Sequence, residues 1–112
     1  MKKDDISFSD FQKLDLRVGK VVTAAQVEGS NSLIKLEVDL GEEVGKRSIL
    51  AGVAKWYNAS QLLGKKFIFV VNLEPKRMMG QESQGMILAA DEQGRAMLIP
   101  VNNGIPEGSI IR

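Results

Sequence analysis

The most restrictive feature of this 112-residue chain is a strict alternation of side-chain polarity in one short segment. Four aliphatic residues alternate there with three charged ones, in the order Ile34, Lys35, Leu36, Glu37, Val38, Asp39 and Leu40. Successive side chains of a β-strand point to opposite faces, so one face of this segment is apolar and the other is charged. The segment is therefore predicted to be a strand that covers a core with one face and meets solvent with the other.

Other segments have strand-like patterns or strand-like composition, and turn residues separate them. We expect strands at residues 16–27, 34–40, 46–51, 66–71, 86–90 and 95–101, with short helices at 7–13 and within 53–63. Gly19 is expected to bend the first strand and turn Lys20 outward. Three strands, a helix and two further strands follow one another as in the OB-fold. The predicted fold is an all-β, five-stranded OB-fold barrel with short helices and a C-terminal β extension.

The chain is expected to form a single domain, residues 1–112, because its length is below that of a typical domain. The barrel is placed at about residues 14–90 and the extension at about 91–112. Residues 66–71, 86–90 and 95–101 are apolar on both faces, whereas the outer face of a barrel strand is normally polar. Something must cover these outer faces. We expect a homodimer with the extension as its dimerisation element, and the alternative is that the extension alone provides the cover.

The chain contains no cysteine and no histidine. A cysteine nucleophile, a Ser-His-Asp triad and a Cys/His zinc site are therefore excluded within it. No local spacing fixes two carboxylates close together, so we expect neither an enzyme nor a cofactor. No stretch approaches the roughly 18 apolar residues of a membrane span, and we expect a cytoplasmic protein.

The net charge of +1 indicates that any nucleic-acid site must be a local patch. Between Leu73 and Met86, Pro75 fixes the loop immediately before Lys76 and Arg77. Met78 and Met79 add apolar surface, and Ser83 and Gln84 add a hydroxyl and an amide. Cations for phosphate, polar groups for sugar or base, and apolar contact surface are what recognition of looped RNA uses. A solvated basic loop is an equally good interpretation of the same residues.

Lys35 is expected to project from the outer face of the second strand. OB-folds commonly bind ligands on this face, beside the loop between the fourth and fifth strands. Lys35 is therefore predicted to join Lys76 and Arg77 in one patch. The basic pairs Lys46-Arg47 and Lys65-Lys66 are interpreted as a solvated hairpin and a strand start.

Five blocks of the sequence form a distinctive series. They are residues 10–19 (DFQKLDLRVG), 27–30 (VEGS), 51–55 (AGVAK), 71–78 (VNLEPKRM) and 82–90 (ESQGMILAA). In this order they resemble the tRNA-binding domain family, which includes the C-terminal domain of many methionyl-tRNA synthetases and small stand-alone bacterial tRNA-binding proteins. The resemblance extends from about Phe8 to the end of the chain.

The resemblance implies an OB-fold with a C-terminal extension, a homodimer in stand-alone members, and binding of the outer corner of tRNA by shape. It implies that Lys76, Arg77, Ser83 and Met86 contact the RNA. The family usually has a lysine at the position of Ser32, so one basic contact is missing here. We expect Lys35 to replace that contact in part.

The sequence thus predicts a non-catalytic tRNA-binding module, either as a stand-alone homodimer or as an appendage that works with the catalytic domain of methionyl-tRNA synthetase. A dimeric chaperone-like binder of unfolded polypeptides, related to bacterial secretion chaperones, is the alternative. A purely structural dimeric appendage is the third hypothesis. The sequence does not distinguish a separate protein from a part of a synthetase, and it does not name a preferred tRNA.

Overall fold

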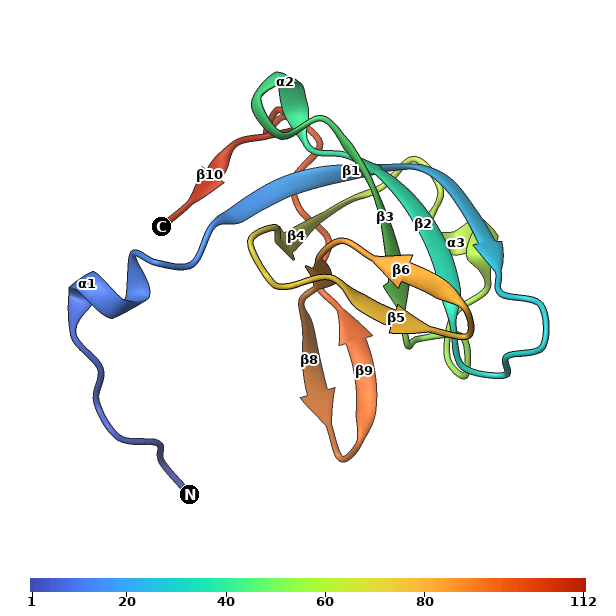
Figure 1. The fold of residues 1–112 in the computed structure, drawn as a ribbon, viewed down its shortest axis with the longest axis horizontal. Helices are drawn as coiled ribbons and strands as arrows, with labels where there is room; N and C mark the ends of the chain where they lie inside the picture. Colours follow the sequence, from blue (N-terminus) through green and yellow to red (C-terminus); the bar gives the residue numbers. More distant parts are fainter.

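A computed structural model describes all residues, 1–112, and its centre is a nearly closed antiparallel barrel (Figure 1). Neighbouring strands follow the order β3-β2-β1-β4-β7. Their bounds are β1 (Leu16–Gln26), β2 (Ile34–Asp39), β3 (Lys46–Ala51), β4 (Lys66–Val70) and β7 (Met86–Ile87). The predicted all-β, five-stranded barrel is confirmed, with a helix between β3 and β4 as in the OB-fold.

The remaining elements are short and surround the barrel. They are α1 (Phe8–Phe11), α2 (Gly41–Val44), α3 (Ala59–Leu62), β5 (Lys76–Met78), β6 (Gln81–Ser83), β8 (Ala89–Glu92), β9 (Arg95–Leu98) and β10 (Ile110–Ile111). The β5–β6 hairpin lies over β3, the β8–β9 hairpin projects from the barrel, and β10 returns to pair with β1 (Figure 1).

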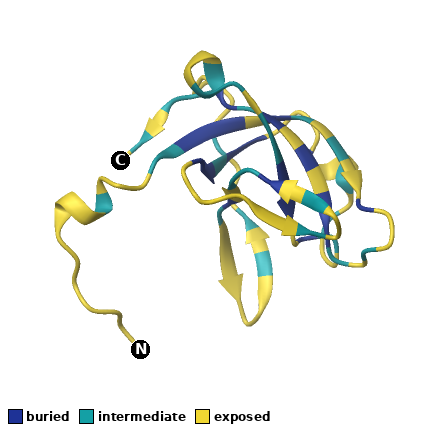
Figure 2. Ribbon diagram, viewed as in Figure 1, coloured by how far each residue is buried: buried dark blue, intermediate teal, exposed yellow.

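The alternation on β2 gives the barrel its inside and its outside. Ile34, Leu36 and Val38 are fully buried or nearly so, while Lys35 and Glu37 are exposed. Figure 2 shows buried residues concentrated on the barrel strands, whereas the N-terminal segment and the β8–β9 hairpin are largely exposed. The alternating strand predicted from the sequence is therefore confirmed.

Gly19 does not form the bulge that the sequence analysis placed there. Residues Leu16 to Lys20 pair regularly with β4, and the register shift lies between Val21 and Thr23. A Cβ on Gly19 would lie 2.5 Å from Val38 Cγ1 and 2.8 Å from Phe69 Cδ1. The glycine leaves room for the core, and Lys20 is exposed as predicted.

Four other expectations need correction. Residues 41–45 and 72–80, which are expected to be loops between strands, contain α2 and β5. The single strand expected at 86–90 divides into β7 and β8, because β8 leaves the barrel to pair with β9. The strand expected at 95–101 ends at Leu98, two residues before Pro100, whose nitrogen has no proton to donate to a ladder.

The two ends of the strand order are joined by a side-chain clasp, which consists of Ser83 and Gln84 bonded to the edge of β3. The Leu50 backbone N–H donates to Ser83 Oγ at 2.9 Å, and that hydroxyl donates to the Gly85 carbonyl at 3.0 Å. The Ser48 N–H donates to Gln84 Oε1 at 3.1 Å, and the Gln84 N–H donates to the Ser48 carbonyl at 2.8 Å. The clasp therefore satisfies the backbone groups of an edge strand that would otherwise lack partners.

The C-terminal segment is tied to β4 by a buried lysine. Lys66 Nζ lies 2.7 Å from Glu107 Oε1 and donates to the carbonyls of Asn103 and Ile105 at 2.9 and 2.7 Å. The side chain of Lys66 is only 10% exposed, and Lys66 begins β4, at the expected strand start. The Val101 N–H also donates to the Lys66 carbonyl. This segment is thus held against the start of β4 by polar contacts.

Arg17 makes a second tie between the barrel and the C-terminal segment. Its guanidinium pairs with Asp15 at 2.7 Å and Glu43 at 3.2 Å, and donates to the Gly108 carbonyl. The hydrogen bond to Asp15 is the main cause that raises the pKa of Arg17, so this buried charge persists at any pH at which the protein folds. The hydrogen bond from Lys66 lowers the pKa of Glu107 below its ordinary value.

We expect Glu107→Gln to lower the free energy of unfolding at pH 7 by about 1–2 kcal/mol, because the buried Lys66 ammonium loses its counter-charge. A carboxylate with a lowered pKa stabilises the fold above its ordinary pKa of about 4.3, and this stabilisation is lost as pH falls through the folded-state value. Urea unfolding at several pH values should therefore show the two proteins converging in acid. Glu92→Gln, on the exposed β8–β9 hairpin, is the control; equal stability of the Glu107→Gln variant and the parent at pH 7 would contradict the tie.

We expect Ser83→Ala to destabilise the protein by about 1–3 kcal/mol, because the Leu50 N–H loses its acceptor in a buried setting. Amide hydrogen exchange at Leu50 should be faster in the variant than in the parent. Ser48→Ala is the matched control, since no hydrogen bond of the Ser48 hydroxyl is seen. Unchanged exchange at Leu50 would show that Ser83 does not close the barrel.

Candidate nucleic-acid interface

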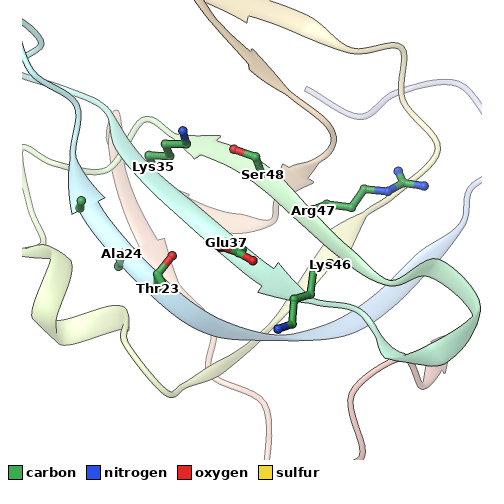
Figure 3. Close-up of a pocket in the computed structure, with 8 residues that line it drawn as sticks. Thr23, Ala24, Lys35, Glu37, Lys46, Arg47 and Ser48 are labelled. Carbon is green, nitrogen blue, oxygen red and sulfur yellow. The ribbon is translucent and has the colours of Figure 1, made fainter.

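The outer face of β1, β2 and β3 is hollowed into a shallow groove of about 490 Å³, which we call the sheet groove (Figure 3). It is lined by Thr23, Ala24, Ala25, Lys35, Glu37, Lys46, Arg47 and Ser48. Glu37 is paired in register with Thr23 on β1 and with Ser48 on β3. The solvent-facing positions of β2 thus supply the middle of the groove.

The charged residues of the sheet groove differ in how far they are engaged. None of the five ion pairs in the structure includes Lys35, Glu37 or Lys46. Arg47 instead donates to the Val71 carbonyl at 2.7 Å and to the Gln84 carbonyl at 3.4 Å, which supports the barrel closure. The two exposed lysines are therefore the cations that the groove offers to a ligand.

A second depression, the hairpin cleft, lies beside β3 where the β5–β6 hairpin approaches the barrel. Its volume is about 600 Å³, and it is lined by Leu50, Asn72, Leu73, Glu74, Lys76, Met78, Ser83, Gly85 and Met86. Leu73 and Met86 are exposed apolar side chains, and Lys76 is the one basic residue among those that line the cleft. This cleft is more apolar than the sheet groove.

The two depressions adjoin along β3. Ser48 lines the sheet groove and Leu50, two residues further on the same face, lines the hairpin cleft. Lys35 is the cross-strand partner of Leu50, so it stands where the two depressions meet. The structure thus places Lys35 beside the β3 residue Leu50, which lines the hairpin cleft together with Lys76 and Met86.

Arg77 and Ser83 are placed differently from what the sequence analysis expected. Lys76 and Arg77 are consecutive residues of β5, so their side chains leave opposite faces of the hairpin. Lys76 lines the cleft, whereas Arg77 donates to the Gly80 carbonyl and is not part of its lining. Ser83 is buried, with its hydroxyl used in the clasp. The structure thus separates Arg77 from Lys76, and it gives Ser83 a place in the wall of the cleft.

Lys46 is the residue of this surface that sequence reasoning missed. It was interpreted as part of a solvated hairpin because glutamates precede it in the sequence. Its register opposite Asp39 on β2 places it at the end of the sheet groove instead. The register between β2 and β3 would have indicated this position, because it determines which residues of β3 lie beside the exposed residues of β2.

The two groups whose pKa is shifted, Arg17 and Glu107, lie outside both depressions. The structure shows no group of three or more acidic, cysteine or histidine residues arranged to hold a metal ion. Its helices are also all too short or too polar to cross a membrane. The residues that line the two depressions offer exposed ammonium groups, hydroxyls and apolar side chains on the strands of a sheet.

Comparison with known proteins assigns the barrel to a family. The family described as "Putative tRNA binding domain" matches residues 16–109. The methionine–tRNA ligase of Caldanaerobacter subterraneus subsp. tengcongensis is 46% identical over 110 residues, which is 98% of this chain and 17% of the ligase. The chain thus spans about one sixth of the length of that curated relative.

Two solved structures have closely similar folds. A protein related to methionyl-tRNA synthetase from Pyrococcus horikoshii has a TM-score of 0.93 and 40% identity, with 98% of this chain and 100% of that one covered. The chaperone CsaA from Bacillus anthracis has a TM-score of 0.87 and 36% identity, with 97% and 100% covered. With a family match over most of its length, this chain belongs to the tRNA-binding domain family.

Proposed function

We propose that the chain is a non-catalytic module that binds folded tRNA with the sheet groove and the hairpin cleft. The observation that carries the proposal is that the two depressions are neighbours on β3, with Lys35 of the sheet groove in register with Leu50 of the hairpin cleft. Membership of the tRNA-binding domain family supports the same conclusion. Because both depressions are preformed on a barrel, the module is expected to recognise the shape of its RNA rather than a long sequence.

The residues of this surface have different proposed roles. Lys35, Lys46 and Lys76 contact phosphates, which makes the affinity dependent on salt. Met86 offers a polarisable apolar contact at the mouth of the cleft. Ser83 positions the cleft wall through the clasp. Arg77 contributes a weaker phosphate contact, because it leaves the other face of the hairpin.

The relatives suggest where such a module acts. The matching relatives are methionine–tRNA ligases, of which this chain corresponds to about one sixth. We propose that the module raises the local concentration of tRNA at the catalytic domain of methionyl-tRNA synthetase in the cytoplasm, as an appended domain or as a separate partner.

We expect Lys35→Gln/Lys76→Gln to weaken tRNA binding roughly tenfold at 0.1 M salt and to reduce the slope of log affinity against log salt by roughly 1.5–2, since two phosphate contacts are lost. Filter binding of unfractionated tRNA across a salt series measures both quantities. Lys3→Gln/Lys65→Gln removes the same charge away from both depressions and should leave the slope near that of the parent. An unchanged slope in the first variant would remove this surface from the proposal.

We also propose that the module is a homodimer joined through its two chain ends. Phe8, Phe11, Leu14, Ile110 and Ile111 line one apolar depression there. Phe8 and Ile110 are 72% and 53% exposed. Strand β10 pairs with β1 along one edge only, so its other edge is open to a second strand. A second copy of the chain would cover both the apolar side chains and the open edge.

We expect the parent protein to sediment at twice the 12.3 kDa mass of the chain and Ile110→Asp to sediment as a monomer, because a buried carboxylate without a partner disrupts an apolar interface. Leu63→Asp is the control, since Leu63 has the same 53% exposure in another part of the surface. A monomeric parent at micromolar concentration would contradict the dimer.

A chaperone-like function is the second candidate, and the apolar lining of the hairpin cleft is the observation that favours it. Leu73, Met78 and Met86 present apolar surface of the kind that extended polypeptides bind. The structural similarity to CsaA chaperones supports this interpretation. In the tRNA titration, competition by a denatured protein that survives the loss of Lys35 and Lys76 would favour this candidate over the first.

A further inference from the structure

The sheet groove contains a carboxylate that phosphate binding alone does not explain. Glu37 is exposed in the middle of the groove and takes part in no ion pair. A carboxylate repels a phosphate, and the effect is strongest where two lysines concentrate the phosphates. A groove built only to attract phosphates would be better without Glu37.

The neighbours of Glu37 form an ordered pattern across three strands. Thr23 on β1 and Ser48 on β3 are its partners in register, and neither hydroxyl has a hydrogen bond in the structure. Lys35 lies two residues away along β2, about 6.7 Å in a strand.

Figure 3 shows Lys35 and Lys46 toward opposite ends of the groove, with Glu37 between them. Asp39, the cross-strand partner of Lys46, is half-buried and its Oδ1 accepts from the Gly41 N–H. Among the residues that line the groove, Glu37 is therefore the acceptor between two cations, with hydroxyls on both sides of it.

This order matches the order of groups along an RNA strand. Two successive phosphates are separated by one ribose, and the ribose carries a 2′-hydroxyl that donates a hydrogen bond. An ionised carboxylate only accepts hydrogen bonds, so it pairs with a hydroxyl and not with a phosphate. The long stems of the two lysines can lean toward phosphates on either side of the sugar, whereas the shorter Glu37 stays over the sheet.

We propose that Glu37 accepts a hydrogen bond from a ribose 2′-hydroxyl and thereby makes the sheet groove select RNA over DNA. The inference rests on the proposed function, because it assigns a selectivity to the same surface. Thr23 and Ser48 hold the sugar from both sides, and Lys35 and Lys46 hold the flanking phosphates. A deoxyribose leaves the carboxylate partly dehydrated and without a donor, whereas the repulsion from the flanking phosphates is the same for RNA and DNA, so DNA is disfavoured by the lost contact.

The test compares tRNA transcripts with transcripts of the same sequence made with 2′-fluoro nucleotides. A 2′-fluoro group keeps an RNA-like sugar shape but has no proton to donate, which separates the hydroxyl from the shape of the helix. We expect the parent to bind the natural transcript about tenfold more tightly, as for a hydrogen bond to a charged group. Glu37→Ala should bind the two transcripts within about twofold. The loss of repulsion raises the affinity of this variant for both, so the ratio isolates the hydroxyl contact.

Glu92→Gln is the matched control, because it removes a carboxylate outside the groove and should keep the ratio of the parent. A parent that binds natural tRNA but does not distinguish it from the 2′-fluoro transcript would overturn the inference and leave the proposed function intact. The inference is also overturned if Glu37→Ala unfolds at the temperature of the parent and still prefers the natural transcript to the 2′-fluoro transcript by the same factor as the parent. A parent that binds neither transcript would instead contradict the proposed function, and the inference with it.

Discussion

Strand β3 would be an open edge of the sheet without Ser83 and Gln84. Their side chains take the place of a strand: each accepts a backbone N–H of β3, and the Gln84 backbone donates to the Ser48 carbonyl. Gly85 follows immediately, and a Cβ there would lie 2.9 Å from the Val70 carbonyl. Barrel closure and the proposed binding surface thus depend on the same contacts, because the clasp provides hydrogen-bond partners for the β3 backbone and holds the hairpin that forms the cleft.

The charged residues of this chain divide between architecture and surface. Arg17, Arg47 and Lys66 bind carboxylates or backbone carbonyls and fix the C-terminal segment or the closure. Lys35, Lys46 and Lys76 line the two depressions. A net charge of +1 is compatible with a polyanionic ligand under this division, because buried ion pairs neutralise each other while the exposed lysines share one side of β3. Total charge therefore underestimates what such a surface can attract.

The parts that the sequence predicts well are those governed by local periodicity. The alternation in β2 determines which residues are inside the barrel, and the order of strands and helix identifies the architecture. The clasp and the tie at Lys66 were missed because they join residues far apart in sequence: Leu50 with Ser83, and Lys66 with Glu107. The separation of Lys76 from Arg77 was missed for a local reason. Residues 72–80 were interpreted as a loop, and only in a strand do neighbours point to opposite faces.

The two depressions differ in polarity, and this difference offers a reason why similar barrels occur both in methionine–tRNA ligases and in proteins named as chaperones. A nucleic acid presents phosphates, sugars and bases together, so it can use the sheet groove and the hairpin cleft at once. An extended polypeptide carries no phosphates for the lysines of the sheet groove to bind, but it can bury apolar side chains against Leu73 and Met86 in the hairpin cleft. Because the clasp holds the hairpin, substitutions in the sheet groove leave the hairpin cleft in place. Under the proposed function, the choice of RNA is therefore assigned to the residues of the groove, above all to Glu37 with its two lysines, and not to the cleft alone.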